Sequence, residues 1–279
     1  MKFPLVSVCM ITYNHEEYIE QALERVLSQQ TPFDVEVIVC DDYSTDSTLE
    51  KLEKYKGRIT VISNKENLGP WRSLEKTFKA AKGKYIALLE GDDYWTDNRK
   101  LQQQVDFLEQ HKEYAMCFTN YACVDEKGAV LNMPGFEYHQ KREVFQQDLF
   151  NLACPPTRGV MFRKETLPEQ FPEVHYETVS GDAFIFSFVL KDKPAYFMDE
   201  KMAVWRIRND SLYSSVSDFE RRLNIVCDFR KYLKYYEDEP QRSQIENTIK
   251  QQQKLVLKNL LLQPRWEKLK QYITMLKHD

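Results

Sequence analysis

Acidic side chains follow predicted strands at several places in the sequence, and carboxylates are groups that bind cations or move protons. Pairs and triplets follow apolar segments, and one residue precedes an apolar helical segment: Asp41, Asp42, Glu90, Asp92, Asp93 and Asp182. Carboxylates at one end of a parallel sheet repel one another unless a cation or hydrogen-bond donors offset their charge. The pattern therefore indicates Mg²⁺ or Mn²⁺ with oxygen ligands, completed by phosphate oxygens and water.

Each acidic position also has a purely structural interpretation. The aspartates in the segment LLEGDDYW can cap the helix that is expected to start near Lys100. Asp182 can cap the apolar helix that follows it, a contact worth about 1 kcal/mol. The residues alone leave a general base and a helix cap equally open for Asp182.

Short β-branched segments alternate with amphipathic helical patterns over the first hundred residues. Strands are predicted at Val6–Thr12, Val35–Cys40, Arg58–Ser63 and Lys84–Leu89. Helices are predicted between them at Glu16–Gln29, at Ser47–Lys56 after a capping Asp46, and from Pro70 to Gly83. This rhythm predicts an α/β fold with a mostly parallel, Rossmann-like sheet flanked by helices, whose ligands bind at the carboxyl ends of the strands.

The second half of the chain has a different pattern. A helix is predicted at Lys100–His111, followed by a hairpin of Ala115–Val124 and Ala129–Leu131. Further strands are predicted at Gly159–Arg163, Ala195–Met198 and Met202–Ile207. From Ser217 the pattern is helical, with breaks at Asp238-Glu239-Pro240 and at Pro264.

The composition is that of an ordinary globular protein and excludes several classes. The 279 residues carry 39 Lys and Arg against 43 Asp and Glu, a balance that argues against a global electrostatic hold on nucleic acid. No apolar segment approaches the roughly 20 residues of a transmembrane helix. The apolar start runs into Tyr13-Asn14-His15 without a cleavage site, so we expect a first strand and not a signal peptide.

The cysteines and histidines indicate no metal site of their own. The six cysteines form no CxxC pair, which favours reduced thiols in a soluble cytoplasmic protein. The five histidines show no ligand spacing, and we expect all of them to be non-catalytic, with His15 the only one near the predicted site.

Four segments in the first hundred residues together resemble a known family. VSVCMITYN, EVIVCDDYSTDST, ENLGP and YIALLEGDDYW are similar, in order and spacing, to the successive signatures of family 2 glycosyltransferases, which have the glycosyltransferase A fold. A weaker likeness continues through PPTRGVMFRKE, SGDAF and VWRIRNDSLY to about residue 215. The resemblance implies a catalytic domain at residues 1–215, followed by a C-terminal helical extension at residues 216–279.

The resemblance assigns the nucleotide site to the ends of the first two strands. Thr12, Tyr13 and Asn14 would line the site for a nucleotide-sugar donor, most simply a UDP-sugar. Asp42 would accept a hydrogen bond from the uracil N–H. Intact acidic positions at these matching places argue against a catalytically degenerate protein that only binds a nucleotide or a partner.

The segment Glu90-Gly91-Asp92 would be this chain's version of the family's metal-binding DxD motif. Glu90 would lie near the ribose or nucleotide, and Asp92 would ligate Mn²⁺ or Mg²⁺. Asp93 would support it or act as a second ligand. Asp182 would be the general base that takes the acceptor's proton, which is typically worth about 10²–10⁴-fold in rate.

One departure from the family bears on the metal. Relatives often have a His after the Arg in the segment that here reads Trp205-Arg206-Ile207-Arg208. Arg208 cannot ligate a metal, but it can pair with phosphate. Arg72, Arg206 and Arg208 are therefore the candidates for charge-assisted bonds to the diphosphate.

The implied reaction is inverting transfer of a sugar from a nucleotide diphosphate sugar to an acceptor hydroxyl of a sugar or lipid-linked acceptor. Trp95 and Arg158 are candidates for the acceptor side, although an aromatic residue near a turn is as often packing. A sugar-1-phosphate nucleotidylyltransferase is a weaker alternative. Its Gly-rich phosphate loop is missing where this chain has Tyr13-Asn14-His15-Glu16.

The last forty residues are basic within an acidic protein. Residues 240–279 hold eight Lys and Arg against three Asp and Glu, together with several leucines. Either this is a helix packed on the body with a solvated basic face, or it is a patch that rests on a partner or on anionic lipid. Many relatives build bacterial surface polysaccharides on lipid-linked acceptors, which would suit peripheral contact at the inner face of the cell membrane.

Overall fold

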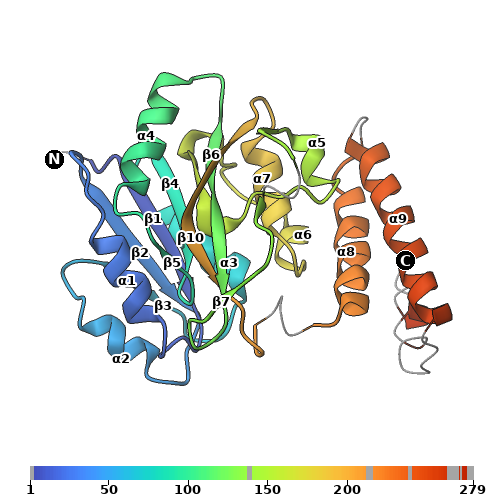
Figure 1. Cartoon of the computed structure of the whole chain (residues 1–279), viewed down its shortest axis with the longest axis horizontal. Coiled ribbons are helices and arrows are strands. Elements are labelled where there is room, and N and C mark those ends of the chain that lie inside the picture. Colours follow the sequence, from blue (N-terminus) through green and yellow to red (C-terminus); the bar gives the residue numbers. More distant parts are fainter. Residues whose placement is uncertain are drawn as a thin grey trace.

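A ten-stranded sheet forms the centre of the computed structural model, which describes residues 3–136, 140–211, 216–237, 241–262, 270 and 272–274 (Figure 1). The strands are β1 (Val6–Thr12), β2 (Val35–Asp41), β3 (Thr60–Ser63), β4 (Tyr85–Glu90), β5 (Tyr94–Trp95), β6 (Met116–Val124), β7 (Val130–Leu131), β8 (Glu143–Val144), β9 (Val160–Arg163) and β10 (Ala195–Arg206). Their order is β3-β2-β1-β4-β9-β6-β10-β5, with β7 paired to β6 and β8 to β10.

The sheet contains parallel pairs in both halves, among its first four strands and again between β6 and β10. The strands β3, β2, β1 and β4 are parallel neighbours, as the alternating pattern of the sequence predicts. Strand β9 departs from the parallel arrangement, because it lies antiparallel between β4 and β6. The two strands expected at 195–207 are one continuous strand, β10, with register shifts between Met198 and Ala203.

Helices cover both faces of the sheet. They are α1 (Ile19–Leu27), α2 (Thr48–Glu53), α3 (Pro70–Ala80), α4 (Lys100–Gln110), α5 (Gln146–Leu149), α6 (Glu173–Tyr176), α7 (Asp182–Val189), α8 (Asp218–Leu233) and α9 (Gln241–Leu262). Successive strand side chains point to opposite faces. Val8 and Met10 therefore pack in one core with α1 and α4, while Cys9 packs in the other with α3 and α7.

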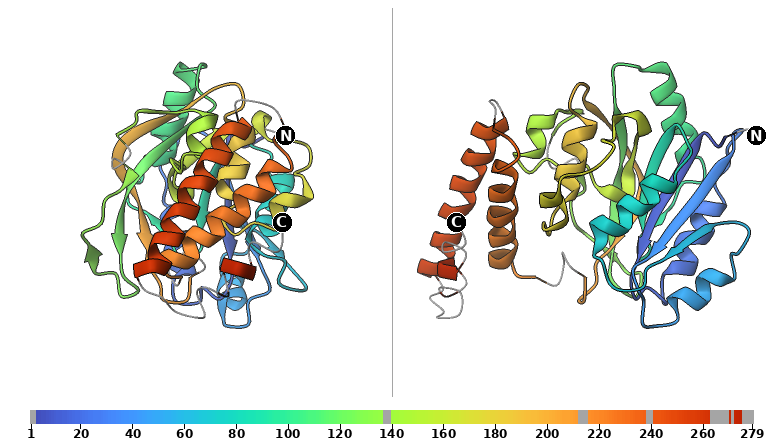
Figure 2. Two further views of the ribbon diagram at one scale, coloured as in Figure 1. Left: turned by 90° about the vertical axis from the view of Figure 1, so that its right-hand side faces the viewer. Right: turned by 180° about the vertical axis from the view of Figure 1, so that it is seen from behind.

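Two C-terminal helices lie side by side against the second half of the molecule (Figures 1 and 2). Helix α8 begins with a capping box, in which Ser217 and Glu220 satisfy each other's backbone N–H groups. The helices share a core with the body through Phe150 and with α7 through Phe184. The predicted breaks at 238–240 and 264 lie outside the described residues.

None of the described helices is long and apolar enough to cross a bilayer.

Candidate active site

Three parallel strands end together and bring their carboxyl-terminal residues to one edge of the sheet. Thr12 pairs with Asp41, and Ile11 pairs with Glu90. The ladder continues one step further, because Asp42 N donates to Thr12 O at 2.9 Å. Gly91 N likewise donates to Ile11 O at 2.9 Å. The acidic segments after β2 and β4 therefore flank the end of β1, as expected for an α/β sheet.

The loop after β1 is tied to the loop after β2. Asn14 has a φ of 54°, a left-handed conformation that Asn tolerates better than most residues. Its side-chain Oδ1 accepts from Thr45 N at 2.8 Å, and its N–H donates to Ser44 Oγ at 3.0 Å. Tyr13 between these loops is 42% exposed. Asn14 thus shapes the edge, and Tyr13 presents a ring on it.

The Asp42 carboxylate organises the start of α3. Its Oδ1 accepts from Asn64 Nδ2 at 2.7 Å and Leu68 N at 2.8 Å, and its Oδ2 accepts from Gly69 N at 2.9 Å. An ionised carboxylate has about four acceptor positions, so one remains on Oδ2. Asp41, in contrast, accepts from the hydroxyl and N–H of Ser44 and stabilises its own turn.

Three buried polar atoms without a hydrogen-bond partner surround the turn after β4. They are Thr12 Oγ1, His15 Nδ1 and Glu90 Oε2. A Cβ on Gly91 would lie 2.8 Å from both Thr12 Oγ1 and His15 Nδ1, so this backbone approaches both side chains closely. Buried polar groups in native proteins nearly always find a partner. Such unpartnered atoms at one edge indicate a place for a polar ligand.

Arg158 offsets the charge of two carboxylates in the turn after β4, Glu90 and Asp93. Its Nε donates to Asp93 Oδ2 at 2.6 Å, and Asp93 Oδ1 accepts from Arg206 N at 2.8 Å. Burial raises the pKa of Asp93 to about 7 against the attraction of Arg158. Burial also raises the pKa of Glu90, whose Oε1 accepts from Thr157 Oγ1 at 2.5 Å. Arg158 thus stabilises the acidic turn from the inside.

Asp92 is the carboxylate of the turn that faces other charged side chains at the edge. Its Oδ2 lies 3.2 Å from Arg208 Nη1 and 3.6 Å from His15 Nε2. Arg208 binds Asp210 through two further nitrogens, at 2.9 and 2.7 Å. Burial lowers the pKa of His15 in spite of the nearby Asp92. Arg208 therefore carries the positive charge that balances Asp92.

The other two candidate arginines are engaged elsewhere. Arg206 donates to the carbonyl oxygens of Asp92, Asp125 and Glu126 and to Gln21 Oε1, so it holds loops together. Arg72 pairs with Glu173 Oε2 at 2.8 Å and lies over the Tyr176 ring of α6. Of the three expected diphosphate contacts, Arg208 is the one whose guanidinium pairs with a carboxylate of the acidic turn.

Asp182 is the first residue of α7 and not its cap, since the capping position is Gly181. Its Oδ1 accepts from Ala183 N at 2.9 Å. Burial raises the pKa of Asp182, while Ala183, Cys154 and Arg158 lower it less. Arg158, which pairs with Asp93, also lowers the pKa of Asp182.

The acceptor-side candidates are interior residues. Trp95 is 1% exposed, its indole N–H donates to Arg158 O, and Lys100 Nζ lies 4.2 Å from its ring centre. It is therefore packed inside the molecule and does not line an open cleft. Its neighbour Arg158 has a 13% exposed side chain, which contacts the buried carboxylates.

Some contacts at this edge join residues that are far apart in the sequence, so no sequence motif indicates them. Thr157 and the close approach at Gly91 depend on contacts across the fold. His15 was expected near the site, and its Nε2 lies 3.6 Å from Asp92 Oδ2. His139 and His278 lie outside the described residues.

Few of the described side chains at this edge can ligate a divalent cation. Among the described residues no three His, Cys, Asp or Glu side chains group as a metal site. Each Asp93 oxygen accepts a hydrogen bond within the protein and the side chain is 3% exposed, a geometry that favours its expected role as support over that of a second ligand. Asp92, next to the unpartnered atoms, fits a cation that takes its other ligands from a diphosphate and water.

Comparison with known proteins identifies curated relatives of the chain. It is 42% identical over 172 residues to an uncharacterised protein of Mycobacterium tuberculosis, covering 60% of this chain and 49% of the relative. The chain thus spans about half the length of the first curated relatives that it matches. It is 33% identical over 215 residues to the putative teichuronic acid biosynthesis glycosyltransferase TuaG of Bacillus subtilis, covering 76% and 82%.

A third relative is named for its donor and acceptor. The Escherichia coli protein WfaP is called a UDP-Glc:alpha-D-GlcNAc-diphosphoundecaprenol beta-1,3-glucosyltransferase. It is 39% identical over 118 residues, which is 42% of this chain and 46% of the relative.

Solved structures share the fold at low sequence identity. Staphylococcus aureus TarS 1–349 in complex with UDP-GlcNAc has a TM-score of 0.69 at 21% identity, covering 97% of this chain and 79% of that one. The mannosyltransferase PcManGT of Pyrobaculum calidifontis, in complex with GDP-Man and Mn²⁺, has a TM-score of 0.65 at 17% identity, covering 98% and 80%. Residues 7–171, more than half of the chain, match the family described as Glycosyl transferase family 2. The chain belongs to this family.

Proposed function

We propose that the chain is an inverting glycosyltransferase that moves a sugar from a UDP-sugar to an acceptor hydroxyl. The observation that carries this proposal is the edge where β1, β2 and β4 end, with its unpartnered atoms around Gly91, in a chain of this family. The names of TarS in complex with UDP-GlcNAc and of WfaP support UDP as the nucleotide.

The nucleotide binds where the first two strands end. Asp42 Oδ2 has one acceptor position for the uracil N–H, and its other positions are filled by the loop before α3. Thr12, Tyr13 and Asn14 line the same edge, with Thr12 Oγ1 available to a polar ligand. Glu90 Oε2 faces the ribose or the nucleotide from the acidic turn.

The diphosphate binds at Asp92. A divalent cation, Mn²⁺ or Mg²⁺, would be held by Asp92 and would stabilise the negative charge of the leaving diphosphate as a Lewis acid. Arg208 lies beside Asp92 and can release it to bind a phosphate oxygen, because its other nitrogens stay on Asp210. His15 borders the same carboxylate.

Asp182 accepts the proton of the attacking hydroxyl. Burial raises its pKa, which makes it a stronger base than an exposed carboxylate. The acceptor oxygen attacks the anomeric carbon as the nucleoside diphosphate leaves from the opposite face, so the configuration inverts. No covalent intermediate forms, and no nucleophilic Ser or Cys takes part.

Titration of UDP into the protein by calorimetry tests the donor site. With Mn²⁺ present we expect binding that weakens with EDTA and in Asp92→Asn, while Glu169→Gln, a change at an exposed residue beside Lys164, leaves it unaltered. No heat of UDP binding under any condition would contradict the UDP donor. Binding that EDTA and Asp92→Asn leave unchanged would contradict the proposed role of the metal but would still support UDP as the nucleotide.

The acceptor is proposed to be lipid-linked, and residues 240–279 to contact an anionic membrane surface. The acceptor proposal rests on the name of WfaP, which specifies a diphosphoundecaprenol-linked acceptor. The contact rests on α9, whose buried side contains Ile245, Ile249 and Val256. Its opposite side exposes Lys250, Lys254 and Lys258 with Leu257 and Leu261. Cations interleaved with exposed leucines suit an anionic bilayer surface, which would place the protein at the inner face of the cell membrane.

Residues 1–215 are proposed to hold the donor site and the base, and residues 216–279 to form a helical extension packed on them. Helices α8 and α9 share a core with α7, so the extension is packed on the body that it follows.

A further inference from the structure

One face of α8 binds the backbone just before Asp182. Asp228 accepts from Val179 N with both carboxylate oxygens at 3.1 Å, and its Oδ2 accepts from Ser180 N at 2.8 Å. The Tyr232 hydroxyl donates to Ser180 O at 2.8 Å. Asp228 and Tyr232 can both reach this segment, because residues four apart lie on the same face of a helix.

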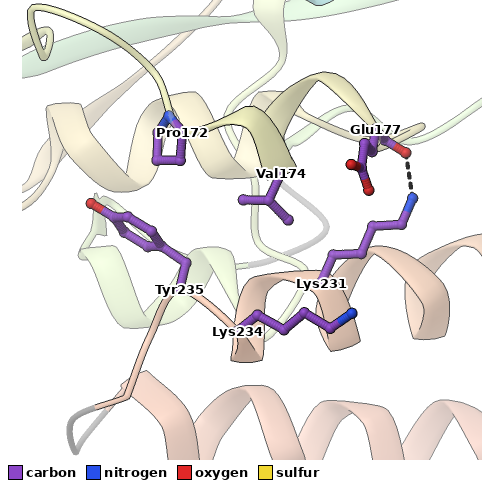
Figure 3. A pocket seen from close by; sticks show the side chains of 6 residues that line it. All are labelled: Pro172, Val174, Glu177, Lys231, Lys234 and Tyr235. Atoms are coloured by element: carbon purple, nitrogen blue, oxygen red, sulfur yellow. Dashed lines mark hydrogen bonds between the residues drawn. The ribbon is translucent and has the colours of Figure 1, made fainter.

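The same face makes a third contact at the rim of a pocket between α6 and α8. Lys231 Nζ donates to the carbonyl oxygen of Glu177, and Figure 3 shows this bond beside Val174 and Lys234. Residues 228, 231 and 232 therefore bind the consecutive backbone of 177–180.

Helix α3 holds the segment from its other side. The Trp71 indole N–H donates to Thr178 O at 2.8 Å. A Cβ on Gly181 would lie 2.6 Å from Trp71 Cε2, so the backbone is pressed against this ring. The segment 177–181 thus lies between α3 and α8, and α7 begins directly after it with Asp182.

Holding a loop with a buried carboxylate costs desolvation free energy. Asp228 is 1% exposed, and burial raises its pKa to about 6 while the two backbone N–H groups lower it. Among the described residues no Lys, Arg or His forms an ion pair with it, so backbone donors are its main compensation. An uncharged residue would pack here at lower cost unless the position of the segment matters.

We propose that Asp228 is a positioning residue, which fixes the segment 177–181 and thereby sets Asp182 against the acceptor hydroxyl. This inference rests on the proposed function, in which Asp182 is the base. It makes the C-terminal extension part of the catalytic unit, since α8 contributes no residue to the donor edge but holds the base in place. A misplacement of about 1 Å in such a group can lower a rate by about 100-fold.

Asp228→Asn tests the proposal, with Val226→Ala as the matched control. Asn has nearly the same volume but presents one amide donor toward the two N–H groups. Val226 is fully buried on α8 and has no polar group to bind the segment, so its truncation weakens α8 packing alone. Three quantities are compared: amide hydrogen exchange at 177–182, release of UDP from UDP-glucose and from UDP-GlcNAc, and calorimetric UDP affinity.

We expect exchange at Val179 and Ser180 to accelerate about tenfold or more in Asp228→Asn, as each amide loses a bond to a charged acceptor. We expect kcat for UDP release to fall about 10- to 100-fold while the donor KM and the UDP affinity stay within about twofold. Tyr232→Phe, which removes only the bond to Ser180 O, should show the same pattern more weakly.

Unchanged exchange in Asp228→Asn, or an equal fall of kcat in Val226→Ala, would overturn the proposal. So would faster exchange with wild-type kcat. A wild-type protein that binds no UDP and releases none from either donor would instead contradict the proposed function. The exchange experiment uses no substrate, so it still decides whether Asp228 holds the segment.

Discussion

Replacing Asp182 by Asn removes the proposed base while keeping the side chain's size and its oxygen bonded to Ala183 N. Because general-base assistance is typically worth about 10²–10⁴-fold, we expect kcat for transfer or donor hydrolysis to fall by that factor. The donor edge at Asp42 and Asp92 is untouched, so calorimetry should give an unchanged UDP affinity. A variant that keeps full turnover would show that Asp182 only begins α7.

At the scale of elements, the turn between β4 and β5 depends on Gly91. A Cβ there would lie 2.8 Å from Thr12 Oγ1 and from His15 Nδ1, so Gly91→Ala must push the end of β1 and the turn apart. We expect a loss of about 1–3 kcal/mol in unfolding free energy, measured by urea denaturation, and weaker UDP binding. His15→Ala in the Gly91→Ala background removes one clash and should recover part of both losses. No recovery would mean that the strain lies elsewhere.

The sequence predicts those elements whose signal is local. The strands around Val8 and Val37 and the helical pattern from Ser217 follow from periodicity, and the carboxylates at strand ends follow from the parallel register. It does not predict the antiparallel β9 beside β4, because the choice of neighbour depends on the whole sheet. Likewise, Arg158 meets Asp93 across 65 residues, and no short spacing encodes that contact.

The sequence predicts where a helix or strand lies more reliably than it predicts which partner each polar side chain binds. Arg206 was expected at the diphosphate, yet its guanidinium is engaged by backbone carbonyls of Asp92, Asp125 and Glu126. The sequence of a motif does not distinguish an Arg that binds a ligand from an Arg that binds a loop. Only the positions of acceptors in the folded chain distinguish the two.

At the scale of the whole molecule, the exposed side of α9 predicts how the protein meets a surface. We expect sedimentation with phosphatidylglycerol-containing vesicles but not with phosphatidylcholine alone, and release by salt, because the attraction of three lysines is screened. Changing Lys250, Lys254 and Lys258 together to Gln should weaken vesicle binding without altering UDP affinity. Changing Lys65, Lys79 and Lys82 on the body to Gln is the matched control. Equal loss in both triple variants would point to net charge rather than to α9.

His175 makes the stability of the whole molecule depend on pH. It is fully buried among Trp71, Phe171 and Phe184, and neither ring nitrogen has a hydrogen-bond partner. Burial lowers its pKa from 6.5 to about 4. Between these values the unfolded chain binds a proton that the folded chain does not. His175 therefore lowers the unfolding free energy as the pH falls from about 6.5 to about 4, by at most about 3 kcal/mol.

His175→Phe isolates this contribution from that of the buried carboxylates. The pKa values of Asp93 and Asp228 are raised to about 7 and about 6, so these groups keep a proton in the folded state and act in the opposite direction as the pH falls. Both are present in wild type and variant and cancel in the difference. We expect the difference in unfolding free energy, measured by urea denaturation from pH 7 to pH 4, to move in favour of His175→Phe as the pH falls. Parallel curves for the two proteins would mean that the folded chain takes up the proton at His175 as readily as the unfolded chain does.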